Sequence, residues 1–86
     1  MVSYSVELSS SARKELRHLP RHELGRVHQR ISELAANPRL HGSQKLAGSD
    51  DSYRLRQGDY RIVYQVNDST HEVIVLRIRH RKDVYR

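Results

Sequence analysis

The sequence predicts a small α+β domain in which a strand, a helical hairpin and three further strands follow one another, a β-α-α-β-β-β order. Three observations predict this order. Residues 4–8 alternate apolar and polar side chains, residues 12–34 carry apolar side chains at helical spacing, and residues 53–78 alternate again around two turns. We therefore expect an antiparallel or mixed sheet with the helical hairpin packed on one face. The length of 86 residues suits a single domain, which we expect to span residues 1–86.

The first half of the chain predicts one strand and two helices. Serines at positions 9–11 offer N-cap oxygens to a first helix, in which apolar residues recur every three or four positions. Pro20 ends this helix and suits the first turn of a second one, which Asn37-Pro38 should stop. The apolar positions of the two expected helices are Ala12, Leu16, Leu19, Leu24, Val27, Ile31 and Leu34.

The second half predicts a surface connection followed by three antiparallel strands. Residues 39–52 show little periodicity and carry glycines and a Ser-Asp-Asp-Ser cluster, so we expect a loop there. Gly58-Asp59 is typical of a two-residue hairpin turn, and residues 67–71 predict a second, polar loop. The expected strands are Tyr53–Gln57, Tyr60–Val66 and Glu72–Ile78.

The two-residue turn fixes the pairing across the first hairpin and thereby the two faces of the sheet. It pairs Leu55 with Ile62, Tyr53 with Tyr64, and Arg56 with Arg61. The apolar and tyrosine pairs share one face, which should cover the helices. We expect the third strand to complete this face with Ile74, Leu76 and Ile78.

The opposite face of the predicted sheet collects arginines. Strand alternation places Arg54, Arg56 and Arg61 there, and Arg77 and Arg79 join them if the third strand keeps its parity. Like charges that lie directly opposite one another destabilise a sheet. The arrangement therefore indicates that an anion normally binds to this face.

Charge and composition favour a polyanionic partner in a reducing compartment. The formal net charge is +6, and residues 77–86 hold five basic residues against one acidic residue. Such a surface is stabilised when it neutralises phosphates, which favours a nucleic acid. With no cysteine, no long apolar run and no apolar leader, the chain is expected to be cytoplasmic.

Several other chemistries lack the residues they need. No Gly-rich turn joins a strand to a helix for a nucleotide phosphate, and no HExxH zinc motif occurs. His18 and His22 are four residues apart, but Pro20 breaks the helix that would align them. We therefore expect no metal and no cofactor, so that any chemistry depends on Arg, His and Tyr.

Two blocks of the sequence carry a resemblance to a known family. They are Tyr53–Tyr64, which reads YRLRQGDYRIVY, and His80–Arg86, which reads HRKDVYR. Shorter matches are Ala12–Leu16 followed by Leu19-Pro20, then Asn37-Pro38, and Lys45–Gly48. The chain resembles the RelE/ParE superfamily of toxins of type II toxin–antitoxin systems, on the RelE side, over nearly its whole length.

The resemblance implies a metal-independent endoribonuclease, an mRNA interferase that inhibits translation by cleaving mRNA in the ribosomal A site. In this reaction the ribose 2′-OH attacks the adjacent phosphate and leaves a 2′,3′-cyclic phosphate and a free 5′-OH. A RelB-like antitoxin would hold the toxin inactive, and operator DNA would be bound only through the antitoxin complex. The positions that are similar to the family's catalytic set are Arg54, Arg56, Arg61, Arg81 and Tyr85.

Arginine stands at Arg54 and Arg56, where the family often carries lysine. A guanidinium is effectively always protonated, so it clamps a phosphate well but makes a poor general base. For proton transfer we therefore expect His80 or Tyr85, although strand parity places His80 on the helix side if the strand continues that far, and Tyr85 also suits base stacking. Further RNA contacts are expected from Lys45, Arg77, Arg79 and Lys82.

Two other functions remain open on the same scaffold. One is a ParE-like toxin that binds DNA gyrase and cuts no RNA, and such a protein should not need the arginine face. The other is an inactive toxin homologue that acts only within an antitoxin complex on DNA. Cleavage of ribosome-bound mRNA would distinguish the mRNA interferase from both of these proteins.

Overall fold

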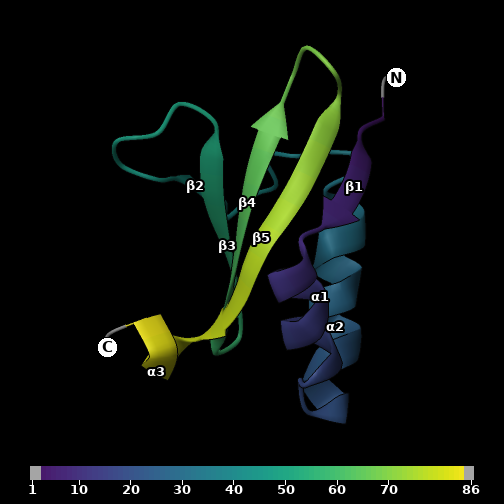
Figure 1. The fold of residues 1–86 in the computed structure, drawn as a ribbon, viewed down its shortest axis with the longest axis vertical. Coiled ribbons are helices and arrows are strands. Elements are labelled where there is room, and N and C mark those ends of the chain that lie inside the picture. Colours follow the sequence, from purple (N-terminus) through teal and green to yellow (C-terminus); the bar gives the residue numbers. More distant parts are fainter. Residues whose placement is uncertain (1–2, 85–86) are drawn as a thin grey trace.

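The computed structural model of the chain describes residues 3–84 and confirms the predicted α+β class. The elements, in chain order, are β1 (Ser5–Leu8), α1 (Ser10–Arg17), α2 (Arg21–Glu33), β2 (Gln44–Lys45), β3 (Ser52–Gln57), β4 (Tyr60–Asn67), β5 (Glu72–His80) and α3 (Arg81–Val84). The strands form one sheet in the order β1-β5-β4-β3-β2, and α1 and α2 lie side by side on one side of it (Figure 1).

The sheet is mixed, since β1 runs parallel to β5 while the other neighbouring strands are antiparallel. Two short elements, β2 and α3, were not predicted. Residues 39–52 were expected to be a loop, but Gln44 and Lys45 within them pair with β3. A strand of two residues and a helix of one turn are too short to produce a periodic pattern in the sequence.

Local contacts decide where the two long helices begin. Ser9 is the N-cap of α1, because its side-chain oxygen accepts a hydrogen bond from the Ala12 N–H at 3.0 Å. Pro20 is the N-cap of α2 rather than part of its first turn, which corrects the prediction by one position. The proline ring fixes φ but leaves ψ open, and here ψ is 146°, which is extended. Of the helices within residues 3–84, none has the length and apolar character needed to cross a membrane.

The core lies between the helical hairpin and the predicted apolar face of the sheet. The pairs Leu55–Ile62 and Tyr53–Tyr64 are both observed, so the register of the first hairpin is confirmed. Tyr64 is fully buried and donates a hydrogen bond to the Pro38 carbonyl at 2.8 Å, and burial raises the pKa of its phenol. The buried residues are Ala12, Val27, Ile31, Leu34, Tyr53, Leu55, Ile62, Tyr64, Val66, Val73, Val75 and Ile78.

A β-bulge in β5 corrects the predicted core face of this strand. Tyr64 of β4 pairs with Val75, but its neighbour Val63 pairs with Arg77, so Leu76 is an extra residue without a partner on β4. The alternation therefore shifts by one position at the bulge. The prediction was right for Ile78, which is buried, and wrong for Leu76 and for Ile74, which is 37% exposed, while Val73 and Val75 lie in the core instead.

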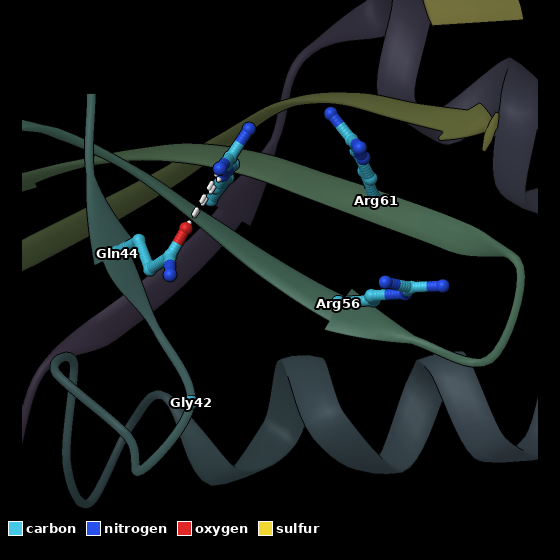
Figure 2. A pocket seen from close by; sticks show the side chains of 5 residues that line it. Gly42, Gln44, Arg56 and Arg61 are labelled. Carbon is cyan, nitrogen blue, oxygen red and sulfur yellow. Dashed lines mark hydrogen bonds between the residues drawn. The ribbon is translucent and has the colours of Figure 1, made fainter. Parts of the chain in front are cut away.

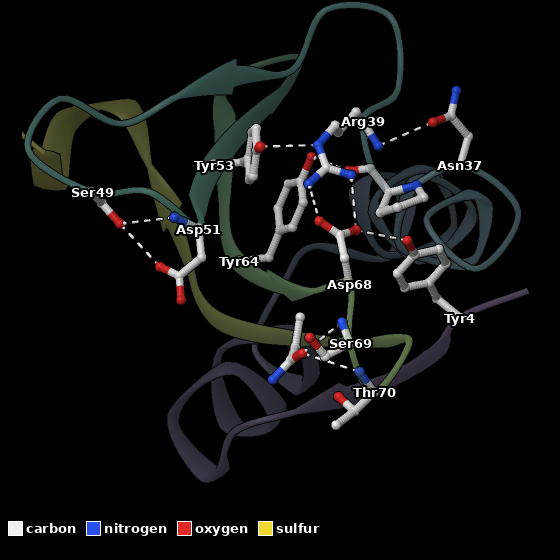
Figure 3. Close-up of polar contacts among 12 residues, drawn as sticks. Tyr4, Asn37, Arg39, Ser49, Asp51, Tyr53, Tyr64, Asp68, Ser69 and Thr70 are labelled. Atoms are coloured by element: carbon white, nitrogen blue, oxygen red, sulfur yellow. Dashed lines mark hydrogen bonds and ion pairs between the residues drawn. The ribbon is translucent and has the colours of Figure 1, made fainter.

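A polar network joins four segments at the edge of the core (Figure 3). Arg39 donates hydrogen bonds to both oxygens of Asp68, at 3.2 and 2.8 Å, and a third to the Tyr53 hydroxyl at 2.9 Å. The Tyr4 hydroxyl donates to Asp68 at 2.7 Å. The hydrogen bonds from Arg39 and then from Tyr4 lower the pKa of Asp68 from 3.8 to about 2. The network thus ties the β4–β5 loop to the segment after α2, to the chain before β1 and, through Arg39, to β3.

Replacing Asp68 by Asn is expected to lower the free energy of unfolding at neutral pH. It should also weaken the dependence of this free energy on pH in the acid range. A carboxylate whose pKa is depressed in the folded state stabilises the fold above its unfolded pKa, and this contribution disappears as the pH falls through the folded pKa. The difference between wild type and Asp68→Asn should therefore be full above about pH 5 and should shrink as the pH falls from 3.8 toward about 2. Urea unfolding at several pH values measures it, with Asp50→Asn, at an exposed loop position, as the matched control. A constant difference across this range would contradict the network's role.

Candidate functional site

Two rows of side chains on the face of the sheet opposite α1 and α2 carry the predicted arginines. In one row, Arg56 of β3 pairs with Arg61 of β4, which in turn pairs with Arg79 of β5. In the neighbouring row, Arg54 of β3 pairs with Gln44 of β2. The structure thus brings together side chains from four strands, and it includes a glutamine that the sequence did not single out.

Two adjoining hollows open at these rows. The first has a volume of about 270 Å³ and is lined by Gly42, Gln44, Arg54, Arg56 and Arg61 (Figure 2). The second has a volume of about 310 Å³ and is lined by Arg56, Arg61, Arg81 and Lys82. Because Arg56 and Arg61 line both hollows, we treat the two as one surface and call it the arginine cleft.

The β3–β4 turn holds two of the arginines of the cleft. The Arg56 Nε donates a hydrogen bond to the Gly58 carbonyl at 3.3 Å. The Arg81 N–H donates to the Asp59 carbonyl at 2.7 Å, and the Arg81 Nε lies 3.7 Å from the Asp59 carboxylate. Gly58 has a φ of +60°, which glycine adopts without strain. The turn therefore fixes the start of α3, and with it Arg81, beside the end of β3.

The register places Arg77 on the same face of the sheet as Arg54 and Arg61. An ion pair with Glu15 neutralises its charge. Its Nε and Nη2 donate hydrogen bonds to the Glu15 carboxylate of α1, at 3.2 and 3.0 Å to Oε2, and these bonds raise the pKa of Arg77. Glu15 also accepts the Ile78 N–H at 2.8 Å, beyond the point where β1 stops pairing with β5. Arg77 was predicted to contact RNA, but it is engaged by this carboxylate and does not line the cleft.

The remaining predicted RNA contacts divide between the two faces. Arg79 is half-buried beside Arg61, and Lys82 lines the second hollow. Lys45 pairs with Tyr53, whose side chain lies in the core, so the register directs Lys45 away from the cleft. Gln44 occupies the cleft position on β2 instead, and a strand of two residues gives no alternation from which this could have been read.

Of the two candidates for proton transfer, His80 lies within the described residues, and it lies away from the arginine cleft. His80 is the last residue of β5 and pairs with Tyr60, with the two rings edge to face and centroids 5.2 Å apart. Since Tyr60 packs against the core, His80 lies on the helix side, and its Nδ1 accepts the Lys82 N–H at 3.1 Å. The parity expectation for His80 is confirmed, and the structure does not bring His80 to the arginine face. Tyr85 lies outside the described residues.

The arginine cleft has the chemistry of an anion-binding site. Its lining carries four guanidinium groups and one ammonium group, from Arg54, Arg56, Arg61, Arg81 and Lys82. A guanidinium presents planar N–H donors that match two oxygens of a phosphate, and an anion relieves the repulsion between neighbouring cations. Within the part of the chain that the structure describes, no group of three or more His, Cys, Asp or Glu side chains is placed to hold a metal ion.

The fold and the cleft define a class of small basic α+β proteins that pack a helical hairpin on one face of a mixed sheet and present an anion-binding surface on the other. Comparison with known proteins gives the family. A family model described as the ParE toxin of the type II toxin–antitoxin system parDE matches residues 6–85. The chain therefore belongs to the RelE/ParE superfamily of toxins of type II toxin–antitoxin systems, and the resemblance read from its sequence blocks is confirmed.

Individual relatives carry RelE-type names. The toxin RelG of Mycobacterium tuberculosis is 33% identical, over 96% of this chain and 97% of its own. The mRNA interferase toxin RelE of Escherichia coli strain K12 is also 33% identical, over 98% of this chain and 92% of its own. In a crystal structure of the archaeal RelE–RelB complex from Pyrococcus horikoshii OT3, one chain matches with a TM-score of 0.82 and 30% identity, over 92% of this chain and 96% of that chain.

Proposed function

We propose that this protein is a RelE-like toxin that cleaves mRNA. The observation that carries the proposal is the arginine cleft, in which two adjoining hollows share Arg56 and Arg61. A toxin that acts by binding another protein has no need of so many cations on one sheet face. The relative from Escherichia coli that is named an mRNA interferase supports the same reading.

The cleft suits attack of a ribose 2′-OH on the adjacent phosphate. A bond forms between the 2′-oxygen and phosphorus, the bond from phosphorus to the 5′-oxygen breaks, and negative charge builds up on the non-bridging oxygens. In the proposal, Arg56, Arg61 and Arg81 stabilise this charge, because preformed cationic donors act most strongly where charge develops in the transition state. Arg54 and Lys82 bind the neighbouring phosphates of the same strand.

The reaction also needs a base that takes the proton of the 2′-OH and an acid that protonates the leaving 5′-oxygen. The candidates predicted for these steps are His80 and Tyr85. His80 lies on the helix side, and its Nδ1 is engaged by the Lys82 N–H, so we leave it out of the reaction. Tyr85 stays a prediction from the sequence, as a proton carrier or as a platform for a base. Arginine remains protonated at neutral pH and therefore serves charge stabilisation rather than base catalysis.

We further propose a RelB-like antitoxin as the partner that silences the toxin. The matched chain from Pyrococcus horikoshii was crystallised as a RelE–RelB complex. A partner that covers the arginine cleft must present acidic or otherwise hydrogen-bond-accepting groups, because the lining consists of N–H donors. Contact with operator DNA is proposed only through the antitoxin.

Incubation of the purified protein with ribosomes stalled on a defined mRNA tests the proposed function. We expect cleavage within the codon of the A site, mapped by primer extension, and 3′ ends that carry a 2′,3′-cyclic phosphate. In cells, expression without an antitoxin should arrest translation before DNA replication stops.

The two other functions give different results in the same experiments. A gyrase poison would leave the mRNA intact and inhibit supercoiling of plasmid DNA in vitro, and this outcome would replace the proposal. An inactive homologue would show neither effect, and growth would continue when the protein is expressed alone.

A further inference from the structure

Two arginines on the same sheet face are held by side-chain oxygen atoms of different charge. Arg54 donates from Nε and Nη2 to the Oε1 of Gln44, at 3.1 and 2.7 Å. Arg77 donates from the same two atoms to the carboxylate of Glu15. The two guanidinium groups are therefore fixed by a similar geometry, but only the partner of Arg77 is an anion.

The difference in charge decides what each arginine offers to an incoming anion. The carboxylate of Glu15 neutralises Arg77, which does not line the arginine cleft. The amide of Gln44 takes up two N–H groups of Arg54 and leaves the positive charge and the remaining donors available. Arg54 and Gln44 both line the first hollow, beside Arg56 and Arg61 (Figure 2).

The backbone places Gln44 where this contact can form. Gln44 pairs with Arg54 across β2 and β3, so the two side chains leave the sheet on the same face and side by side. A guanidinium has only donors, so the amide oxygen of Gln44 has to be the atom that faces Arg54. Because the acceptor is neutral, it restricts the orientation of a long side chain without lowering the charge of the cleft.

We propose that Gln44 is a positioning residue, which orients the Arg54 guanidinium toward a phosphate of the RNA strand without neutralising it. The inference rests on the proposed function in taking RNA as the anion. Its electrostatic part is tested by binding alone, so it is separable from cleavage. A free Arg54 side chain would sample several rotamers and would lose more entropy on binding a phosphate.

The test compares Gln44→Glu and Gln44→Ala with wild type, and it uses Gln29→Glu as the matched charge control on the exposed surface of α2. Binding of a short single-stranded RNA is measured by fluorescence anisotropy over a range of salt concentrations. In Gln44→Glu the carboxylate neutralises Arg54, so the slope of log affinity against log salt should become shallower by about 0.7, the value for one phosphate contact. Gln29→Glu should leave the slope unchanged.

Gln44→Ala separates orientation from charge. This variant keeps the charge of Arg54, so the slope of log affinity against log salt should stay that of wild type. The single-turnover cleavage rate on ribosome-bound mRNA should fall by about tenfold, because the Arg54 guanidinium is no longer held in position. Gln44 is exposed, and unchanged melting temperatures will show that the variants remain folded.

Each other result overturns the inference or the function on which it rests. Equal slopes for Gln44→Glu and Gln29→Glu, or a wild-type cleavage rate in Gln44→Ala, would overturn the role of Gln44. If the slopes differ between variants as expected but the wild-type protein cuts no mRNA, the proposed function is overturned. The neutral contact between Gln44 and Arg54 is then still supported. Absence of RNA binding by wild type would overturn both.

Discussion

Replacement of Arg61 by Ala is expected to lower the single-turnover rate of mRNA cleavage by about 10²- to 10³-fold, the usual effect of removing one preformed donor from a developing oxyanion. Arg61 lines both hollows of the arginine cleft and lies between Arg56 and Arg79 in the row that crosses three strands. Its loss therefore removes one of the two guanidinium groups, those of Arg56 and Arg61, that line both hollows. The fold should persist, since the variant also removes repulsion between neighbouring like charges.

Arg26→Ala is the control for this experiment. Arg26 is exposed on α2, on the helix side of the sheet, and the substitution removes the same formal charge. We expect its cleavage rate to stay within about twofold of wild type, as is usual for surface changes away from a site. Arg81→Ala should resemble Arg61→Ala, and cells should tolerate expression of both. If Arg61→Ala and Arg26→Ala were equally active, the arginine cleft would not be the site of cleavage.

Replacement of Ile62 by Ala is expected to destabilise the protein by about 2–5 kcal/mol, through lost burial and the cavity that remains. Ile62 is fully buried under the helices, between Leu55 and Ile78 on the neighbouring strands. For a small domain with a total stability of about 5–15 kcal/mol, this loss is large, and a fall in melting temperature of about 10 °C or more should follow. Urea and thermal unfolding measure the effect.

Ile74→Ala is the control for the Ile62→Ala experiment. Ile74 is also an isoleucine of the sheet, but it is 37% exposed and lies on the opposite face. Ile74→Ala should therefore cost less than about 1 kcal/mol, because little apolar surface is lost from the core. Similar losses for the two variants would mean that the core does not lie where the buried residues place it.

The sequence was sufficient for the part of the site that depends on a two-residue turn. Gly58-Asp59 sets the register of β3 against β4, and from that register the shared face of Arg54, Arg56 and Arg61 follows by alternation. A slip of one residue in this pairing would move the arginines into the core and the apolar side chains into water. Local chemistry and burial therefore specify the same pairing.

The remaining features depend on contacts between distant parts of the chain, which carry no local signal. The pairing of Gln44 with Arg54 relies on a strand of two residues, and the ion pair of Arg77 joins a strand to Glu15 on the first helix. The displacement of His80 from the cleft follows from the length of β5, which alternation alone does not determine. These contacts decide which cations remain available, and only the tertiary structure reveals them.

The extra residue at Leu76 also bears on how such a chain can diverge. Val73 and Val75 point into the core, and without the bulge the same parity would continue to Arg77 and Arg79, burying two charges. Deletion of Leu76 would make Val75 and Arg77 consecutive, so that they pair regularly with Tyr64 and Val63 and both faces of the strand are kept. A deletion that left the bulge in place would instead reverse the faces of the residues that follow it. Within β5, the bulge is therefore where the strand can lose one residue while Val75 and Ile78 stay in the core and Arg77 and Arg79 stay on the opposite face.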